Sequence, residues 1–430
     1  MITFDDIEPQ LVSLLQAHRE SLAPLGPMLI NRDLNGRVRI IAQEDRVTDD
    51  AGRAAMDTVA ADMRKKLGAH VAPEGSLILY EADLDAVAAS GLSRPLAEDL
   101  PGYRIVDRLA TGTRWATVEE PSDGAARRIV FFSIKGGVGR STALAACARH
   151  LAQGGRKILV VDLDLESPGL SSSLLPDDRC PRYGVTDWMV EDLVGNADEM
   201  IEDMVAVSDL SELGDIRAVP AHGAKPGDYL LKLGRVWMPK VTADRATEPW
   251  PRRLNRLIDA LEARYTPDVV LIDSRSGIDE TASAVVTDLG AHLVCLFAIH
   301  GAQTWTGYRI LFEHWKRAGV VKDIRDRLQI VAGLVPETDS VAYVDALRQA
   351  SWDLFGEYLY DEVEAGATAE FSFDLAEPDA PHQPWAIHWN RGFAALERLH
   401  GNEVVVDDER VRAVFGEVFD GLDKLTPAED

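Results

Sequence analysis

From residue 128 onward, short and continuously apolar runs alternate with longer segments whose apolar residues recur at helical spacing. We interpret the apolar runs as buried strands, at Arg128–Ser133, Lys157–Val161, Val269–Ile272, Leu293–Ala298 and Leu328–Leu334. Strands that are apolar on both faces and are joined by amphipathic helices are typical of a parallel sheet covered by helices on both sides. We therefore predict an α/β fold with a mainly parallel sheet flanked by helices.

The first 120 residues follow a mixed pattern, in which both helical and strand-like periods occur. Predicted helices cover Ile7–Leu22 and Ala51–Leu67, and predicted strands cover Val38–Ala42, Leu77–Tyr80, Tyr103–Val106 and Trp115–Val118. This part is expected to form a small α+β domain that binds a partner or regulates the rest of the chain.

The same patterns suggest boundaries for the remaining parts of the chain. Residues 121–127 are polar and contain proline and glycine, so we predict a linker there, followed by the core at 128–336. Within the core we expect a helix at Val185–Val194, a strand at Ile216–Pro220 and an exposed insertion at Gly227–Thr247. Residues 337–430 are predicted to complete the core with helices, with an irregular segment at Glu377–Arg391 and an acidic helix at Glu409–Leu425.

Composition narrows the classes of function. A formal net charge of -26 argues against a protein that coats nucleic acid, and against one held on an anionic lipid surface. The three cysteines, Cys147, Cys180 and Cys295, contain no CxxC pair, which excludes a zinc or iron–sulfur ligand set of cysteines. Neither a basic-then-apolar leader nor an apolar run of the roughly 20 residues needed by a membrane helix is found, so we expect a cytoplasmic protein.

The strongest chemical signal is a glycine-rich segment between the first core strand and its helix, Ile134-Lys135-Gly136-Gly137-Val138-Gly139-Arg140-Ser141-Thr142. Glycines allow successive backbone N–H groups to surround a phosphate, and the N-terminus of the following helix adds a partial positive charge. Ser141 is placed to offer its hydroxyl to Mg²⁺. The common P-loop pattern GxxxxGK[ST] is not met, because Ile134 replaces the first glycine and Arg140 replaces the lysine. The simpler alternative is a glycine-rich turn without a ligand.

Two further segments place carboxylates at strand ends. Asp162 and Asp164 follow the second strand, and being two residues apart they leave it on the same side. Asp273 ends the third strand and is followed by Ser274-Arg275-Ser276-Gly277. In an open parallel sheet the carboxyl ends of the strands form the ligand-binding edge, so all three aspartates are expected beside the glycine-rich loop. The alternatives are solvated turn aspartates and an aspartate that caps a strand.

Together these three segments resemble the deviant Walker A (MinD/ParA-like) branch of P-loop proteins, whose loop reads KGGxGK[ST]. The resemblance covers roughly residues 128–335 and implies binding of ATP and Mg²⁺. It implies that Lys135 reaches across a homodimer interface to the partner's nucleotide, that Asp164 orients the attacking water, and that Ser141, Asp162 and Asp273 hold Mg²⁺. The loop residues 135–142 would contact the phosphates, and Pro336, after the fifth strand, would border the base.

Arg140 departs from the family pattern. Arginine keeps the positive charge and can contact two phosphate oxygens, but it is larger and planar where lysine is a compact charge. We therefore expect Arg140 to bind nucleotide and to take part in catalysis, with hydrolysis as the step most affected. No NKxD or TKxD guanine motif is present, which favours ATP over GTP.

Three functions stay open on this basis. The first is an ATPase switch that forms an ATP-dependent homodimer and controls a protein effector through its N-terminal or C-terminal regions. The second is a nucleotide-sensing regulator with negligible hydrolysis. The third is a bacterial-type tyrosine kinase, disfavoured because the final segment GLDKLTPAED has no tyrosine. Nucleic acid is a less favoured partner, and the acidic tail argues against a membrane.

Overall fold

The computed structural model describes residues 2–73, 75–109, 115–122, 124, 126–210, 215–242, 245–362, 371–390 and 408–427. By their contacts they divide into two compact units, Met1–Thr111 and Gly112–Asp430. The domain boundaries inferred from the sequence stay predictions, and residues 123 and 125 of the predicted linker lie outside the described part. No helix in the described ranges is long and apolar enough to cross a membrane.

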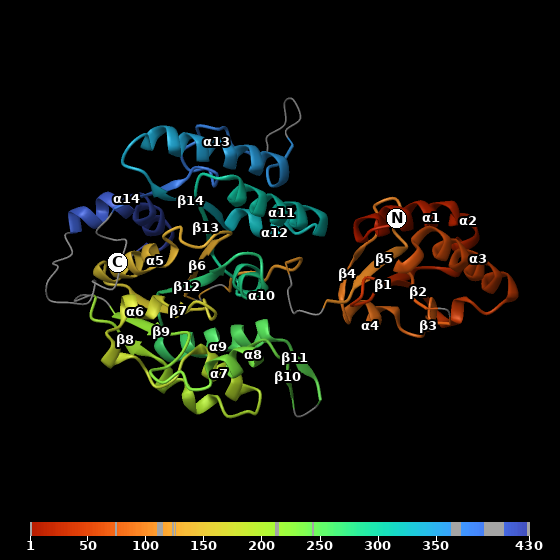
Figure 1. The fold of residues 1–430 in the computed structure, drawn as a ribbon, viewed down its shortest axis with the longest axis horizontal. Helices are drawn as coiled ribbons and strands as arrows, with labels where there is room; N and C mark the ends of the chain where they lie inside the picture. The colour runs from red at the N-terminus through yellow and green to blue at the C-terminus, as the bar shows by residue number, and fades with distance from the viewer. Residues whose placement is uncertain are drawn as a thin grey trace. The chain divides into compact units, whose positions relative to one another are not determined.

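The first unit is built on a five-stranded mixed sheet with the order β3-β2-β1-β5-β4 (Figure 1). Its strands are β1 (Met28–Arg32), β2 (Val38–Gln43), β3 (Ile78–Glu81), β4 (Leu92–Pro95) and β5 (Tyr103–Asp107). Helices α1 (Ile7–Ala17), α2 (Arg19–Leu22) and α3 (Asp50–Leu67) contribute to its main core, and α4 (Leu84–Ala89) packs beside a smaller cluster. The unit thus has a hydrophobic core of its own.

Several predictions for this unit need correction. The helix expected over Ile7–Leu22 is interrupted at His18, where the backbone leaves the helical region. Residues 115–118, predicted as a strand of this domain, belong to the second unit and form no strand. The central strand β1 was not predicted, although all five of its residues are buried. Its sequence MLINR includes Asn31 and Arg32, which hide the apolar run that usually marks a buried strand.

The second unit contains an eight-stranded sheet with the order β15-β14-β13-β6-β12-β7-β9-β8, in which only β8 pairs antiparallel. This confirms the predicted mainly parallel sheet. The strands are β6 (Arg127–Ser133), β7 (Lys157–Asp162), β8 (Ala206–Val207), β9 (Asp215–Val219), β12 (Val269–Ser276), β13 (Leu293–Ala298), β14 (Leu328–Val335) and β15 (Trp385–His388).

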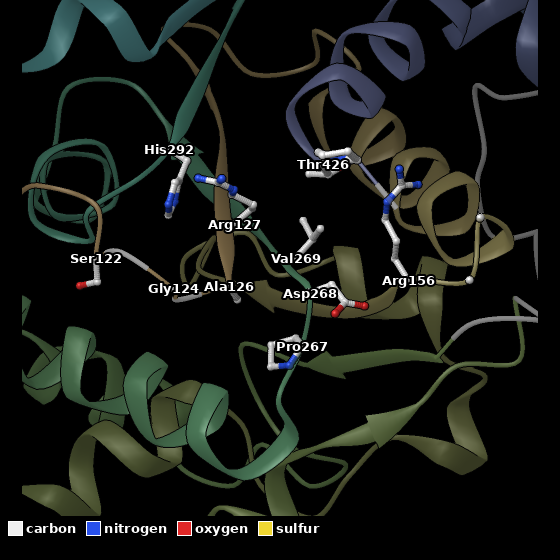
Figure 2. A pocket seen from close by; sticks show the side chains of 13 residues that line it. Ser122, Gly124, Ala126, Arg127, Arg156, Pro267, Asp268, Val269, His292 and Thr426 are labelled. Atoms are coloured by element: carbon white, nitrogen blue, oxygen red, sulfur yellow. The ribbon is translucent and has the colours of Figure 1, made fainter. Parts of the chain in front are cut away.

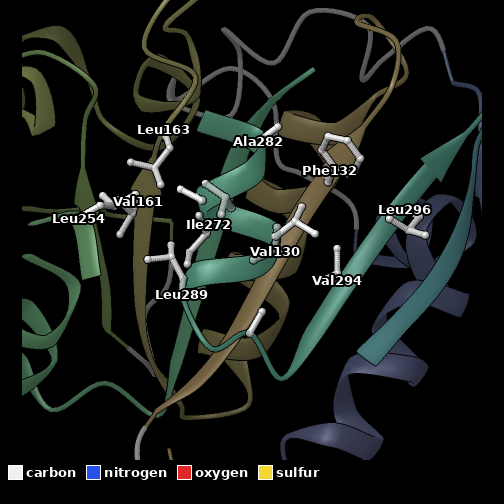
Figure 3. Close-up of a cluster of buried hydrophobic side chains, with 14 of the residues drawn as sticks. Val130, Phe132, Val161, Leu163, Leu254, Ile272, Ala282, Leu289, Val294 and Leu296 are labelled. Carbon is white, nitrogen blue, oxygen red and sulfur yellow. The ribbon is translucent and has the colours of Figure 1, made fainter. Parts of the chain in front are cut away.

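Successive residues of each central strand enter two different cores, one on each face of the sheet. In β6, Val130 and Phe132 join one core, while Ile129 and Phe131 join the other. Figure 3 shows the first core, in which side chains from β6, β7, β12 and β13 meet Leu254, Ala282 and Leu289. The helices that contribute to this core include α7 (Val185–Asp192), α9 (Trp250–Tyr265), α10 (Glu280–Ser283), α11 (Ala302–Ala318) and α13 (Ser340–Tyr358). The other face is covered by α5 (Arg140–Gln153), α6 (Leu170–Leu174) and α14 (Asp408–Leu425).

The segment predicted to be irregular, Glu377–Arg391, contains strand β15 at the edge of the sheet. β15 pairs parallel with β14, and α14 packs on it so closely that a Cβ on Gly421 would lie 2.3 Å from the Trp385 ring. Proline and histidine around it conceal a short edge strand that only its tertiary neighbours stabilise. The predicted insertion at 227–247 contains helix α8 (Tyr229–Val236) and strand β10 (Lys240–Val241), and strand β11 (Thr247–Glu248) begins at its last residue.

Candidate functional site

The glycine-rich loop lies between β6 and α5, at the carboxyl edge of the sheet. Gly137 and Gly139 both have positive φ, 73° and 86°, a region that residues with a Cβ rarely adopt. Lys135, Gly136 and Gly137 are exposed, whereas Val138 is buried beneath the loop. Gly139 is the residue before α5, so the loop leads directly into the N-terminus of that helix. This is the arrangement in which backbone amides and a helix N-terminus can bind a phosphate.

The structure brings the three predicted aspartates together beside this loop. Asp273 of β12 is paired directly with Asp162 of β7, and Asp164 follows in the loop after β7. Asp162 and Asp273 are buried, with 2% and 1% of their surface exposed, and Asp164 is partly buried. Asp162 Oδ1 accepts a hydrogen bond of 3.1 Å from the Asp164 backbone N–H. Adjacent parallel strands therefore place the carboxylates on one edge, as expected from their positions.

Arg140, the first residue of α5, points toward these carboxylates. Its Nε donates to Asp273 Oδ1 at 2.6 Å, and its Nη2 donates to Asp164 Oδ2 at 3.1 Å. Its Nη1 donates to Ser133 Oγ at 3.0 Å. Burial disfavours the charged form of Arg140, but the neighbouring Asp273, Asp164 and Asp162 outweigh it and raise the pKa of the guanidinium. The side chain is therefore a buried and fully charged bridge between two strand ends.

The oxygen donors beside the loop suit a hard cation such as Mg²⁺. Ser141 Oγ donates to Asp273 Oδ2 at 2.6 Å, an orientation that leaves the hydroxyl lone pairs available. Asp162 Oδ2 is buried without a hydrogen-bond partner in the structure. Burial, together with the negative charge of Asp273, raises the pKa of Asp162 to about 8. Among the described residues, no group of three or more acidic, histidine or cysteine side chains is arranged so that it could hold a metal ion.

Strand β14 also contacts the glycine-rich loop. A Cβ on Gly333 would lie 2.4 Å from the Val138 carbonyl oxygen, so the two backbones are in close contact. Pro336 follows the last residue of β14 and is partly exposed. Thr142 is partly buried in the first turn of α5.

Two contacts near the strand ends had not been predicted from the sequence. Arg275, near the end of β12, forms an ion pair of 2.6 Å with Glu166, which joins this strand to the loop after β7. Tyr229 of α8 donates its hydroxyl hydrogen to the Leu165 carbonyl at 2.5 Å. Arg275 lies within the segment quoted after Asp273, and Glu166 lies two residues after Asp164. No sequence signal links Tyr229 to Leu165, 64 residues away.

A cavity of about 620 Å³ lies where the parallel strands begin, at the end of the sheet opposite to the glycine-rich loop. Figure 2 shows the residues that line it. Arg127, Arg156 and His292 line it beside the first residues of β6 and β12. Gly154 and Thr426, the residues that directly follow α5 and α14, also line it, so the negative ends of both helices face a cavity that contains two arginines. This cavity is separate from the loop and its aspartates.

Comparison with known proteins gives a consistent assignment for this part of the chain. Residues 129–342 match the family described as the CobQ/CobB/MinD/ParA nucleotide binding domain. No curated protein matches the chain by sequence.

Similar solved structures include pNOB8 ParA bound to nonspecific DNA, with 16% identity, a TM-score of 0.43, and coverage of 70% of this chain and 96% of that one. MinD from Pyrococcus horikoshii OT3 complexed with Mg-ADP has 20% identity, a TM-score of 0.41, and coverage of 70% and 98%. Cobyrinic acid a,c-diamide synthase from Mycobacterium smegmatis, with bound ATP analog and magnesium, has 20% identity, a TM-score of 0.36, and coverage of 56% and 83%. By its loop, its sheet and the match over residues 129–342, the chain carries a MinD/ParA-like P-loop nucleotide-binding domain of the CobQ/CobB/MinD/ParA family.

Proposed function

We propose that this chain is an ATP-binding molecular switch of the MinD/ParA type, in which ATP drives homodimerisation and slow hydrolysis reverses it. The observation that carries the proposal is the convergence of Asp162, Asp164 and Asp273 beside a phosphate-binding type of loop. Arg140 contacts Asp164 and Asp273, and Ser141 contacts Asp273. Phosphoryl transfer needs mainly positioning and charge stabilisation, and this edge of the sheet supplies both.

In this proposal the amides of residues 136–142 bind the phosphates, and Pro336 borders the base. Lys135 is exposed at the start of the loop, where a second copy of the chain can approach it. Each Lys135 would then complete the site of the partner copy. An effector would bind through the N-terminal unit or the C-terminal region, outside the matched residues 129–342.

Magnesium fits the same edge. Ser141, Asp162 and Asp273 would hold it, and when bound it would offset the negative charge of the phosphates. Asp164 would orient the water that attacks the γ-phosphate, with Arg140 fixing the position of its carboxylate through the Nη2 hydrogen bond.

A regulator with negligible turnover is favoured by a different observation. Both oxygens of Asp164 are engaged, Oδ2 with Arg140 at 3.1 Å and Oδ1 with the Ser167 N–H at 3.3 Å. A carboxylate whose two oxygens already accept hydrogen bonds from the protein has fewer lone pairs left to orient an attacking water. A single-turnover assay at saturating ATP separates the two functions, since phosphate release above buffer requires the hydrolysing switch.

The dimer is tested by light scattering after size exclusion, with and without ATP·Mg²⁺. We expect the unmodified chain to double its mass with nucleotide and Lys135→Ala to stay monomeric while still binding ATP. Lys157→Ala is the matched control, because this lysine is exposed at the start of β7, at the opposite edge of the sheet. A mass that ignores nucleotide in all three proteins would rule out the dimer switch.

A further inference from the structure

Every nitrogen of the Arg140 guanidinium donates a hydrogen bond to a protein group. Nε, Nη1 and Nη2 donate to Asp273, Ser133 and Asp164, and the residue is only 7% exposed. These partners come from the ends of β6 and β12 and from the loop after β7. A planar group held at three points by three segments is far more fixed than a lysine ammonium would be.

The charge around Arg140 explains why it is held there. Asp162, Asp164 and Asp273 bring three carboxyl groups to a largely buried edge, and both Asp164 and Asp273 form their ion pairs with Arg140. Removing a guanidinium from two buried carboxylates leaves uncompensated charge, which is strongly unfavourable. Contact with a phosphate would require Arg140 to give up these interactions.

We propose that Arg140 is an internal counter-ion of the strand-end aspartates, and that it thereby uncouples nucleotide binding from Mg²⁺. This inference rests on the proposed nucleotide-binding function. Carboxylates beside a phosphate loop repel a triphosphate unless a cation lies between them, and that cation is usually the metal. Here the Arg140 side chain supplies part of the positive charge that offsets the carboxylates. ATP therefore binds with or without Mg²⁺, while hydrolysis still needs the metal.

The test compares dissociation constants for a fluorescent ATP analogue, measured once with Mg²⁺ and once with EDTA. For the unmodified chain we expect the two constants to agree within about threefold, because Arg140 offsets the carboxylates in both conditions. For Arg140→Lys the ammonium can turn to the phosphate and leave the aspartates, so EDTA should weaken binding at least about tenfold. Arg149→Lys is the matched control, since Arg149 lies on the same helix and pairs with Asp408 on α14. It should behave as the unmodified chain.

The possible results distinguish a failure of this inference from a failure of the proposed function. Absence of binding in both conditions would defeat nucleotide binding itself. Tight binding with Mg²⁺ that is lost at least tenfold in EDTA, in the unmodified chain, would overturn the counter-ion role alone. If Arg140→Lys does not fold, as judged by circular dichroism, the two dissociation constants of the unmodified chain and its crystal structure with ATP still decide the inference. A crystal structure with ATP should keep the Arg140–Asp273 contact, and an Arg140–phosphate contact in its place would contradict the inference.

Discussion

At the scale of single residues, a buried charge stabilises the fold only where other groups compensate it, and Asp192 is such a residue. Asp192, the last residue of α7, is only 2% exposed and accepts hydrogen bonds from Lys240, Arg253 and Arg256. Arg253 is itself fully buried, and its Nη1 also donates to the Met238 carbonyl at 2.6 Å. One carboxylate therefore joins α7, α9 and the segment around β10, on the sheet face opposite to α5.

This cluster predicts a specific dependence on acid. Burial disfavours the charged Asp192, but hydrogen bonds from Arg256, Arg253 and Lys240 lower its pKa to about 2. An aspartate in the unfolded chain has a pKa of about 3.9. The ionised Asp192 therefore stabilises the folded chain fully above that pH, and this contribution is lost as the pH falls from about 4 to about 2. We expect Asp192→Asn to reduce the free energy of unfolding by about 3–5 kcal/mol at pH 7.

Urea denaturation at pH 7 and at low pH checks this prediction. The difference in free energy of unfolding between Asp192→Asn and the unmodified chain should narrow as the pH falls toward about 2, where half of the Asp192 carboxyls in the folded chain are protonated. Asp198→Asn, at an exposed position six residues after the end of α7, is the control and should change the free energy of unfolding little. A loss that is the same at both pH values would show that packing, and not charge, is responsible.

At the scale of elements, the phosphate loop depends on a strand that contributes no charged side chain to it. β14 passes so close to the loop that only a glycine fits at 333, because a Cβ there would lie 2.4 Å from the Val138 carbonyl oxygen. Both groups are backbone, so neither can turn away. The shape of the loop is thus determined partly by its neighbour in space.

We expect Gly333→Ala to displace the loop and to weaken ATP binding by at least about tenfold, with a stability loss of about 1–3 kcal/mol from overpacking. Isothermal titration with ATP and thermal unfolding measure the two effects. Gly356→Ala, in α13, is the matched control because a Cβ there meets nothing within 4 Å. Unchanged ATP affinity in Gly333→Ala would contradict a role of β14 in shaping the loop.

At the scale of the whole molecule, the chain contains two units with separate cores. Among the described residues, the main core of the first unit is formed by side chains between Ile7 and Ile105. A hydrophobic core of this size is sufficient for cooperative folding of a small domain.

We therefore expect a fragment of residues 1–109 to fold alone and to unfold in a single cooperative transition. Circular dichroism during heating measures this. Leu14 is fully buried in α1, so Leu14→Ala should lower the stability by about 2–5 kcal/mol, equally in the fragment and in the whole chain. A fragment without a cooperative transition would show that the first unit needs the second.

The sequence alone determined the class of fold, the glycine-rich loop and the identity of the three aspartates. These features are local, because periodicity reports burial along one element and glycine reports backbone freedom within one turn. The predicted parallel sheet is confirmed for this reason, and the three carboxylates meet because parallel strands end at one edge. The roles assigned to them stay predictions.

Only the tertiary structure decided the direction of Arg140, the edge strand β15, the buried strand β1 and the close approach of Gly333 to Val138. Each depends on contacts between segments far apart in the sequence, as in the hydrogen bond that joins Arg140 to Asp273 across 133 residues. Which partner a charged side chain selects follows from the burial and charge of all its spatial neighbours together, and no local pattern records them.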